Sequence, residues 1–501
     1  MRRAAVSAAF CLVPLAGLAQ DVTLTSRDGT LTISGSLQGF DGELYRVATQ
    51  YGLLTLDAQG VLCEGPACPD MMHYVAELRL TGPAGAGEAL LPALLAGFAG
   101  QKGLALREDQ QGGLWRATLF DPEEGYNLAH FTYSPQPDPI AIEAVRLAGA
   151  EMAFADLPEP DLNSRTLGLQ ALVAIVAPGN PLAAMATTDL ARVLSGKVAN
   201  WSELGGPDMP MAVHGLAADS SFRRALERRL GQAMVVTEEH ASLSELAAAV
   251  ARDPWAIALT SGAEVDGARV LALTDSCGFT LNPARLSVKA EDYPLTQPLY
   301  LLTAKRRLPL VGREFMDYLA TPAAAQAVAS AGLIDRGVEE ADLVSDGLRL
   351  ANAIRAAQEV GIAELQRLTT AMQGARRLSL TFRFEGGAKT LDAASRDNLA
   401  DLVRLIEAGQ FRDKELVFVG FSDGSGGAEA NLELSRDRAD VLREAVAAAV
   451  PDLADQRVSL AVEAFGEAMP MACDESPVGR QVNRRVELWV RATRDSPPSE
   501  N

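Results

Sequence analysis

A glycine-rich loop followed by a helix places an acid and an arginine where they can act together. Asp423 follows an expected strand over 416–421, and Arg438 lies about two turns into an expected helix over 432–449. The intervening glycines let the chain turn sharply and bring backbone N–H groups close to a ligand. An acid binds an ammonium and an arginine binds a carboxylate, so the pair can hold a zwitterion. The alternative is that the two side chains only brace the loop against the helix.

Several groups in and beyond this loop resemble the OmpA-like C-terminal domain family, which binds peptidoglycan. The matching groups, in chain order, are Gly420-Phe421-Ser422-Asp423, Asn431, Leu434-Ser435, Arg438-Ala439, Gly466-Glu467, Pro470 and Asn483-Arg484-Arg485-Val486. The resemblance implies that Asp423 meets the ammonium, and Arg438 the carboxylate, of diaminopimelate in the stem peptide. It also implies that Asn431 and Arg484 shape or extend this site. For Arg484 and Arg485 a purely structural role is an equal alternative.

A second set of motifs, between residues 178 and 206, resembles the periplasmic phosphate-binding proteins of the PstS-like class. These motifs are Pro178-Gly179-Asn180-Pro181-Leu182 and the run Ser195-Gly196-Lys197-Val198-Ala199-Asn200-Trp201-Ser202-Glu203-Leu204-Gly205-Gly206. The lysine of this run is not part of a P-loop, because the preceding glycines and the following Ser or Thr are missing. The resemblance implies a two-lobed domain that closes on a small anion such as phosphate, with an ABC transporter as a further partner.

The candidate anion donors are the backbone amide of Gly82 and the side chains of Ser220, Ser221 and Arg223. A dehydrated phosphate needs many such donors. The first ligand loop, residues 80–87, departs from the family because proline and alanine replace its hydroxyl residues. The alternative for the two serines is that they cap the helix that begins near Phe222.

Three functional hypotheses follow from these motifs. The first is a periplasmic solute-binding protein tethered non-covalently to peptidoglycan, and the second is a scaffold protein that has lost its ligand but keeps the same anchor. The third, a wall enzyme, lacks a catalytic constellation. The loop after Asp423 is only superficially similar to a serine-protease loop, and no histidine lies beyond His240. We therefore predict no enzymatic activity and no cofactor.

The composition and the N-terminus indicate an exported, acidic protein. Arg2 and Arg3 precede a short apolar run and a small-residue cleavage site after Ala19, which is typical of a cleaved signal peptide. The alternative is an N-terminal membrane anchor. Residues 1–19 contain two arginines and no acids, so cleavage takes the formal net charge from −20 to −22. This acidity argues against nucleic acid as a partner. The expected location is the periplasm, in association with the cell wall and outer membrane.

Four cysteines remain after cleavage, and an oxidising compartment allows them to pair. Cys63 and Cys68 bracket a short turn, so we predict a local disulfide between them. Cys277 and Cys473 fall in different predicted domains, and the sequence does not pair them. The sequence contains no CxxC motif, and its histidines do not have the spacing of metal ligands, so it does not indicate a metal site.

The periodicity of apolar residues predicts a multidomain α/β and α+β protein, and the two resemblances imply the identity of its larger segments. The expected segments are a signal peptide at 1–19, a small β module at 20–72, a two-lobed binding domain at 73–340, a helical linker at 341–373, an OmpA-like βαβαββ domain at 374–493 and a disordered tail at 494–501. Within the binding domain we expect a strand near residues 75–80, a Gly/Ala-rich loop and then a helix over 89–100. Asp392 is the expected N-cap of a helix over 392–408.

Overall fold

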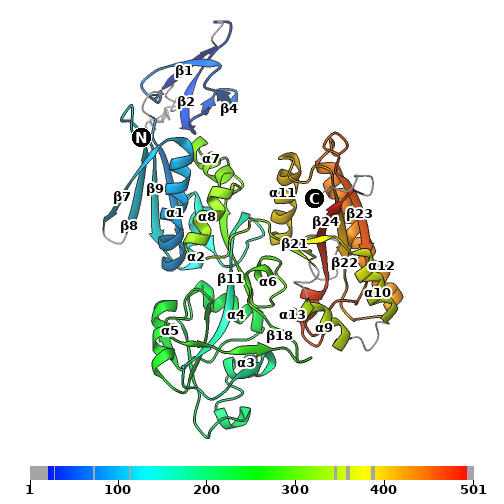
Figure 1. Ribbon diagram of the computed structural model, residues 1–501. Helices are drawn as coiled ribbons and strands as arrows, with labels where there is room; N and C mark the ends of the chain where they lie inside the picture. The colour runs from blue at the N-terminus through cyan, green and yellow to red at the C-terminus, as the bar shows by residue number, and fades with distance from the viewer. Residues whose placement is uncertain are drawn as a thin grey trace, which may run out of the picture.

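The computed structural model describes residues 21–26, 29–70, 74–111, 114–342, 347–356, 362–384 and 390–493. The predicted signal peptide and the predicted tail lie outside these residues. Figure 1 shows a small N-terminal sheet in blue, a two-lobed domain from cyan to green, and a C-terminal domain from yellow to red. Among the described residues, no helix combines the length and the apolar character needed to cross a membrane.

The N-terminal module is a five-stranded antiparallel sheet with strand order β4-β3-β2-β1-β5. Its strands are β1 (Val22–Ser26), β2 (Thr32–Phe40), β3 (Leu44–Thr49), β4 (Gly52–Asp57) and β5 (Val61–Glu64). The module buries only a small apolar cluster, which includes Val22, Leu24 and Val47. The Cys63–Cys68 disulfide reinforces this small core.

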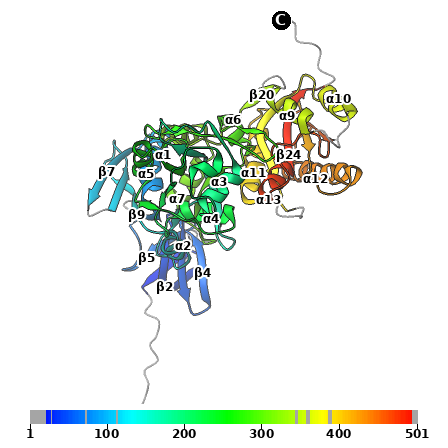
Figure 2. The same cartoon turned by 90° about the horizontal axis from the view of Figure 1, so that it is seen from below.

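Charged contacts dock the N-terminal module on helix α7 (Leu310–Tyr318) of the next domain. Arg307 bonds to Asp41 and Glu43, and Arg313 bonds to Glu43 at 2.6 Å. The backbone N–H of Leu310 donates to the carbonyl oxygen of Asp41 at 2.7 Å. Figures 1 and 2 both place the module at the α7 end of the two-lobed domain.

The two-lobed domain is built on one long mixed sheet with strand order β14-β13-β15-β11-β19-β10-β6-β9-β8-β7. Strand β11 (Asn163–Val176) runs through both lobes: its first part, to Ala171, pairs with β19 (Thr296–Thr303), and its second part, from Leu172, pairs with β15 of lobe 2. Lobe 1 also contains β6 (Ala76–Gly82), α1 (Ala84–Lys102), β7 (Ala105–Gln111), β8 (Leu114–Phe120), β9 (Asn127–Pro135), α2 (Asp138–Arg146), β10 (Met152–Ala155), α7 and α8 (Pro322–Ser330).

Lobe 2 carries the opposite end of the sheet and a separate three-stranded sheet, β12-β17-β18. Its elements are β12 (Ala184–Ala186), α3 (Thr187–Leu194), η1 (Trp201–Leu204), β13 (Ala212–Leu216), α4 (Ser221–Leu230), β14 (Glu238–His240), α5 (Leu243–Arg252), β15 (Ala256–Ser261), β16 (Arg269–Val270), β17 (Ala272–Thr274), β18 (Thr280–Leu281) and α6 (Arg285–Lys289). Each lobe has its own apolar core, and the two cores meet along β11.

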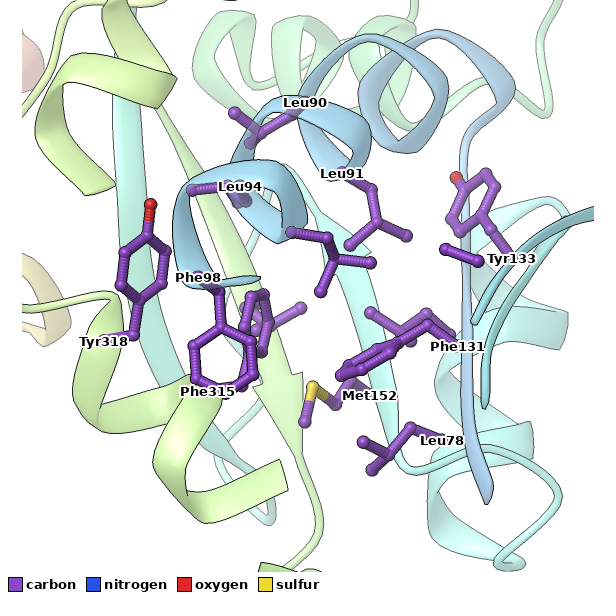
Figure 3. Packing of buried hydrophobic residues seen from close by; sticks show 14 of the residues in the cluster. Leu78, Leu90, Leu91, Leu94, Phe98, Phe131, Tyr133, Met152, Phe315 and Tyr318 are labelled. Atoms are coloured by element: carbon purple, nitrogen blue, oxygen red, sulfur yellow. The ribbon is translucent and has the colours of Figure 1, made fainter. Parts of the chain in front are cut away.

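Helix α1 packs its leucines on the lobe 1 sheet, as Figure 3 shows. Phe98 meets Phe315 of α7 edge to face, with ring centroids 5.6 Å apart. The helix begins at Ala84, so the prediction of a loop followed by a helix from residue 89 was wrong. Gly87 is helical and lies against an aromatic ring: a Cβ there would be 2.1 Å from Cζ of Tyr133. This glycine therefore permits close packing within a helix rather than a loop.

The C-terminal domain is a five-stranded sheet with order β20-β21-β24-β22-β23, in which β22 and β23 are parallel. Its elements are β20 (Glu340–Asp342), β21 (Arg376–Arg383), α11 (Ala393–Glu407), β22 (Lys414–Gly420), α12 (Ala428–Ala449), β23 (Ser459–Ala464), α13 (Pro477–Asn483) and β24 (Arg485–Ala492). The predicted helical linker contains two helices, α9 (Gly347–Ala356) and α10 (Ile362–Ala371). Leu368 of α10 is buried in the same apolar cluster as Trp489 of β24.

Helix α11 of the C-terminal domain lies against the two-lobed domain close to the point where β11 passes between the lobes. Asp397 accepts a hydrogen bond from the backbone N–H of Thr166 at 2.6 Å and pairs with Arg336 at 3.2 Å. Asp401 pairs with Arg336 at 2.7 Å and with Arg165 at 3.2 Å. All four charged side chains are 12–15 % exposed, so these pairs are partly shielded from water.

Strand β21 contacts lobe 2 through two arginines. Arg377 pairs with the buried carboxylate of Asp292 at 2.6 Å. Arg383 donates to the carbonyl oxygens of Ala290 and Glu291 at 3.2 and 2.7 Å. Together with α11, these contacts seat the C-terminal domain on both sides of the inter-lobe crossing.

A disulfide between Cys277 and Cys473 joins lobe 2 to the C-terminal domain covalently, across 196 positions of sequence. Asp275 supports the same joint: it accepts the backbone N–H of Cys473 at 2.8 Å and those of Cys277 and Phe279 at 3.0 and 2.7 Å. The two domains therefore form one cross-linked unit.

Candidate functional site

The loop between β22 and α12 holds the first of the predicted peptidoglycan-binding residues. Asp423 is 7 % exposed, and its Oδ1 accepts the backbone N–H of Ser425 at 3.0 Å. Gly420 ends β22 directly against α12, because a Cβ at Gly420 would lie 1.9 Å from the carbonyl oxygen of Ser435. This close approach of strand and helix places the loop over the first turns of α12, where Asn431 also lies.

Arg438 is buried in α12, with 2 % of its surface exposed. Its Nε and Nη1 atoms have no hydrogen-bond partner among the described residues. The guanidinium lies 5.5 Å from the ring centroid of Phe384. Burial lowers the pKa of Arg438, the neighbouring charge of Arg484 lowers it further, and Asp423 acts in the opposite direction. A buried guanidinium with unsatisfied donors is a ready site for a carboxylate.

The structure brings the four predicted residues to one region. Arg484 lies at the end of α13 and approaches Asp423, with Nε and Oδ2 3.4 Å apart. Asn431 faces the glycine loop, because a Cβ at Gly426 would lie 3.8 Å from its Oδ1. Its amide nitrogen donates to Glu467. The region thus contains carboxylates and guanidinium groups side by side, as a zwitterionic ligand requires.

Asp474 belongs to the same site, and the sequence did not single it out. Its Oδ2 accepts the backbone N–H of Gly424 at 2.7 Å, and its Oδ1 accepts the Asn483 amide at 2.8 Å. The Asn483 oxygen in turn accepts the backbone N–H groups of Met471 and Ala472. Asn483 was among the matched motif residues, and its amide is the kind of group that fixes a loop. This was the available signal that the loop over 471–474 borders the site.

Arg485 has a structural role. It is fully buried, donates to Glu487 at 2.8 Å and to the carbonyl oxygen of Met469 at 2.9 Å, and stacks on Phe421. Glu487 also pairs with Arg377 at 3.2 Å. Arg485 therefore belongs to the charge network beneath the site, whereas its neighbour Arg484 faces Asp423.

A second candidate site is a cleft of about 620 Å³ between the two lobes. It is lined by the N-terminal ends of α1, α2, α4 and α5 and by the segments over 216–222, 240–244 and 261–264. Ser220 and Ser221 both line it. Ser220 also caps α4 by accepting the backbone N–H of Arg223 at 3.2 Å, so the capping role proposed for it is observed.

Two predicted anion donors are not presented to this cleft. The guanidinium of Arg223 is directed into lobe 2, where it bonds to Glu227, Glu239 and the carbonyl oxygens of Leu216 and Met234. The assignment of Arg223 as an anion donor is therefore corrected: its charge is used within the lobe. Gly82 is the last residue of β6 and is not among the residues that line the cleft.

Contacts across the cleft join the two lobes. Ser221 of lobe 2 donates to Asp156 of lobe 1 at 2.6 Å, and Arg224 of lobe 2 pairs with Asp138 of lobe 1 at 2.9 Å. Burial raises the pKa of Asp156 to about 6, against the hydrogen bond from Ser221. Burial also raises the pKa of Asp138, with Arg224 opposing this rise.

Lobe 2 also gathers two histidines that spacing along the sequence did not connect. His214 lies on β13 opposite Glu238 of the parallel strand β14, which places His240 on the same face. His240 Nε2 and His214 Nδ1 are 3.0 Å apart. Suitable ligand atoms of His214, Glu238 and His240 lie within 4.8 Å of one another. Strand pairing, which spacing alone does not reveal, creates this cluster.

Comparison with known families places the two main domains. Residues 144–323 match a PBP superfamily domain, and residues 383–484 match the OmpA family. The chain carries a PBP superfamily domain and an OmpA family domain. Both matches lie within the segments predicted for these domains, and the multidomain fold prediction is confirmed.

Individual relatives resemble parts of the chain. The probable lipoprotein YiaD of Escherichia coli K12 is 27 % identical over 107 residues, which is 21 % of this chain and 46 % of that protein, so the chain spans just under half of its length. An ABC-type phosphate transport receptor from Vibrio cholerae is 18 % identical with a TM-score of 0.40, covering 51 % of this chain and 99 % of the other. A phosphate-bound putative substrate-binding protein of a phosphate ABC transporter from Clostridium perfringens is 18 % identical with a TM-score of 0.41, covering 52 % and 99 %.

Proposed function

We propose that this protein is a periplasmic solute-binding protein that its OmpA family domain tethers non-covalently to peptidoglycan. The observation that carries the anchor is the buried guanidinium of Arg438, whose Nε and Nη1 lack partners among the described residues. Such a group is costly to keep in a folded protein unless a ligand compensates for it. The proposed ligand is the zwitterionic end of the diaminopimelate stem peptide.

The proposed binding mode uses the charges that already surround Arg438. The ligand carboxylate binds Arg438, and its ammonium binds Asp423, in place of part of the Asp423–Arg484 contact. Arg484, which is 26 % exposed in its side chain, can then move toward the ligand carboxylate. Asn431 and Asp474 hold the walls of the site through Glu467 and Gly424.

Sedimentation of the full-length protein with purified peptidoglycan tests the anchor. Arg438→Ala and Asp423→Ala should each abolish co-sedimentation, because each removes one half of the zwitterion clamp. Arg436→Ala is the matched control, since Arg436 is an exposed arginine two positions away on α12. If both site variants sediment like the wild-type protein while the control behaves normally, the anchor assignment is wrong.

The solute-binding part of the proposal is supported by the inter-lobe cleft in the PBP superfamily domain. It involves reversible binding without a reaction, and an ABC transporter is the partner that such a domain would serve. Phosphate or a similar small anion is the ligand implied by the sequence motifs, with Ser220 and Ser221 as donors. A thermal shift or calorimetric heat with phosphate would support that ligand.

The alternative function is a scaffold that is anchored to peptidoglycan and binds no solute. The contacts Ser221–Asp156 and Arg224–Asp138 favour it, because they join the lobes without any ligand. Unchanged melting temperature with every solute tested, together with normal peptidoglycan binding, would favour the scaffold over the solute-binding protein.

A further inference from the structure

Strand pairing at the edge of lobe 2 gathers two imidazoles and a carboxylate. The parallel register of β13 and β14 sets His214 opposite Glu238, and His240 follows two positions later on β14. Because alternate residues of a strand point to the same face of a sheet, all three side chains share one face. Their ligand atoms lie within 4.8 Å of one another. Since β14 is the outermost strand at this end of the sheet, the cluster lies at a sheet edge.

The two imidazoles are close enough to share a metal ion. His240 Nε2 and His214 Nδ1 are 3.0 Å apart, so one of these nitrogens carries a proton that the other accepts. Two ligand atoms of a tetrahedral zinc site, with bonds of about 2.1 Å, lie about 3.4 Å apart. A small outward movement of either ring would therefore seat an ion between the two nitrogens. The shared proton would move to the outer nitrogen of its ring.

Glu238 is placed to supply a third ligand. Its Oε1 lies 3.9 Å from His240 Nε2, and its Oε2 lies 3.7 Å from His214 Nε2. Its side chain is 60 % exposed and can rotate over the imidazoles, so an ion can enter from solvent on this side. Two imidazoles and a carboxylate suit Zn²⁺, whereas Ca²⁺ and Mg²⁺ prefer oxygen ligands.

The second nitrogen of His214 is a buried polar atom that the fold leaves unsatisfied. The side chain is 2 % exposed, and its Nε2 has no hydrogen-bond partner among the described residues. Asp253 Oδ2 lies 3.8 Å from this nitrogen. A metal-bound imidazole usually donates its other N–H to a carboxylate, a carbonyl oxygen or water. An ion on Nδ1 would leave the proton on Nε2, facing Asp253, which is this arrangement. Burial also lowers the pKa of His214, and metals bind the neutral ring.

We propose that His214 Nδ1, His240 Nε2 and Glu238 bind a divalent transition-metal ion of the zinc class. Asp253, which ends α5, then accepts the Nε2–H of His214. The ion would fasten the edge strand β14 to β13 and to the end of α5. This proposal is independent of the solute and of peptidoglycan, because neither proposed interaction uses these four residues.

Zinc titration of the untagged full-length protein, freed of metal with a chelator, tests the site. By calorimetry we expect one Zn²⁺ to bind per chain. Zn²⁺ should also raise the melting temperature, because an ion that binds only the folded state stabilises it. Ca²⁺ and Mg²⁺ at the same concentrations should produce neither effect, which separates a zinc-type site from general attraction of cations to an acidic protein.

Variants of the cluster complete the test. His240→Gln and Glu238→Gln should each weaken Zn²⁺ binding at least about 100-fold, since even outer-shell partners change metal affinity about 10- to 100-fold. Glu238 is exposed, so its replacement leaves folding intact. Asp253→Asn, which keeps the oxygen that accepts the backbone N–H of Trp255, should weaken Zn²⁺ binding about tenfold.

Glu239→Gln is the matched control, because Glu239 is the neighbouring acid of β14 and bonds to Arg223 instead of the cluster. It should leave Zn²⁺ binding unchanged. The proposal is overturned if no Zn²⁺ binds, if Ca²⁺ or Mg²⁺ binds as tightly, if His240→Gln and Glu238→Gln bind Zn²⁺ like the wild-type protein, or if Glu239→Gln weakens binding as much as they do.

Discussion

Replacing Arg438 by methionine should raise the stability of the OmpA family domain while removing its proposed ligand binding. The guanidinium is 2 % exposed and its Nε and Nη1 are unpartnered among the described residues. Replacement of a whole buried ion pair by apolar side chains of similar volume ranges from neutral to about 4 kcal/mol stabilising, and we expect the same sign for a buried guanidinium whose Nε and Nη1 lack partners among the described residues. The contact with the Phe384 ring, at 5.5 Å, offsets about 0.5–1 kcal/mol of this gain.

We therefore expect a net stabilisation of about 1–2 kcal/mol for Arg438→Met. For a domain of this size the corresponding rise in melting temperature is roughly 4 °C per kcal/mol. Binding should change in the opposite direction, because the loss of charge-assisted hydrogen bonds weakens peptidoglycan binding by at least about tenfold. The two measurements are scanning calorimetry of the full chain and sedimentation with peptidoglycan.

Arg436→Met provides the control, since its exposed position on α12 should confine the change in stability to about 0.5 kcal/mol. The reasoning is refuted if Arg438→Met lowers stability by more than about 1 kcal/mol relative to this control. That result would mean that the guanidinium stabilises the free domain. Unaltered peptidoglycan binding by Arg438→Met would refute the ligand assignment instead.

Three further predictions concern the joint and the cleft. The double variant Cys277→Ser/Cys473→Ser should lower the stability of the docked domains by about 2–4 kcal/mol and weaken peptidoglycan sedimentation, and unchanged values in both assays would contradict a supporting role for the disulfide. Burial raises the pKa of Asp156 to about 6 in the folded protein, so its contribution to stability is complete below about pH 4 and falls by roughly 3 kcal/mol as the pH rises through 6. In Asp156→Asn the difference between the melting temperatures at pH 4.5 and pH 7.5 should therefore be smaller than in the wild-type protein. An unchanged difference would show that Asp156 is not the source of this pH dependence. Asp397→Ala should loosen α11 from lobe 1 and increase the radius of gyration measured by small-angle scattering, and an identical scattering curve would show that this contact is dispensable.

The sequence predicted those parts of the fold that local chemistry determines. Asp392 caps α11 by accepting the backbone N–H of Ser395 at 2.8 Å, and an aspartate at a helix start is a local signal. The start of α1 was mispredicted because its glycines favoured the prediction of a loop. Gly87 instead lies in the helix and leaves room for the ring of Tyr133. Such a glycine cannot be told from a loop glycine without knowing what packs against it.

The sites show the same division between local and long-range information. Asp423 and Arg438 could be singled out because a strand, a loop and a helix bring them together within one short stretch. Asp474 depends on a loop that returns to Gly424 from 50 positions away. Arg223 of helix α4 was misassigned because its partner Glu239 lies on strand β14, 16 positions along the chain. Whether such residues belong to a site depends on side-chain direction and on long-range pairing, and the spacing of residues along the sequence predicts neither.

The Cys277–Cys473 disulfide constrains the order of synthesis, folding and disulfide formation in this protein. Cys277 emerges from the ribosome long before Cys473, so its thiol must stay reduced or be held by another partner until the last strands are made. The four cysteines of the two disulfides allow three connectivities, and an early bond from Cys277 to Cys63 or Cys68 would trap the chain. Production in a reducing cytosol, or without a disulfide isomerase, should therefore yield folded domains that lack their covalent joint.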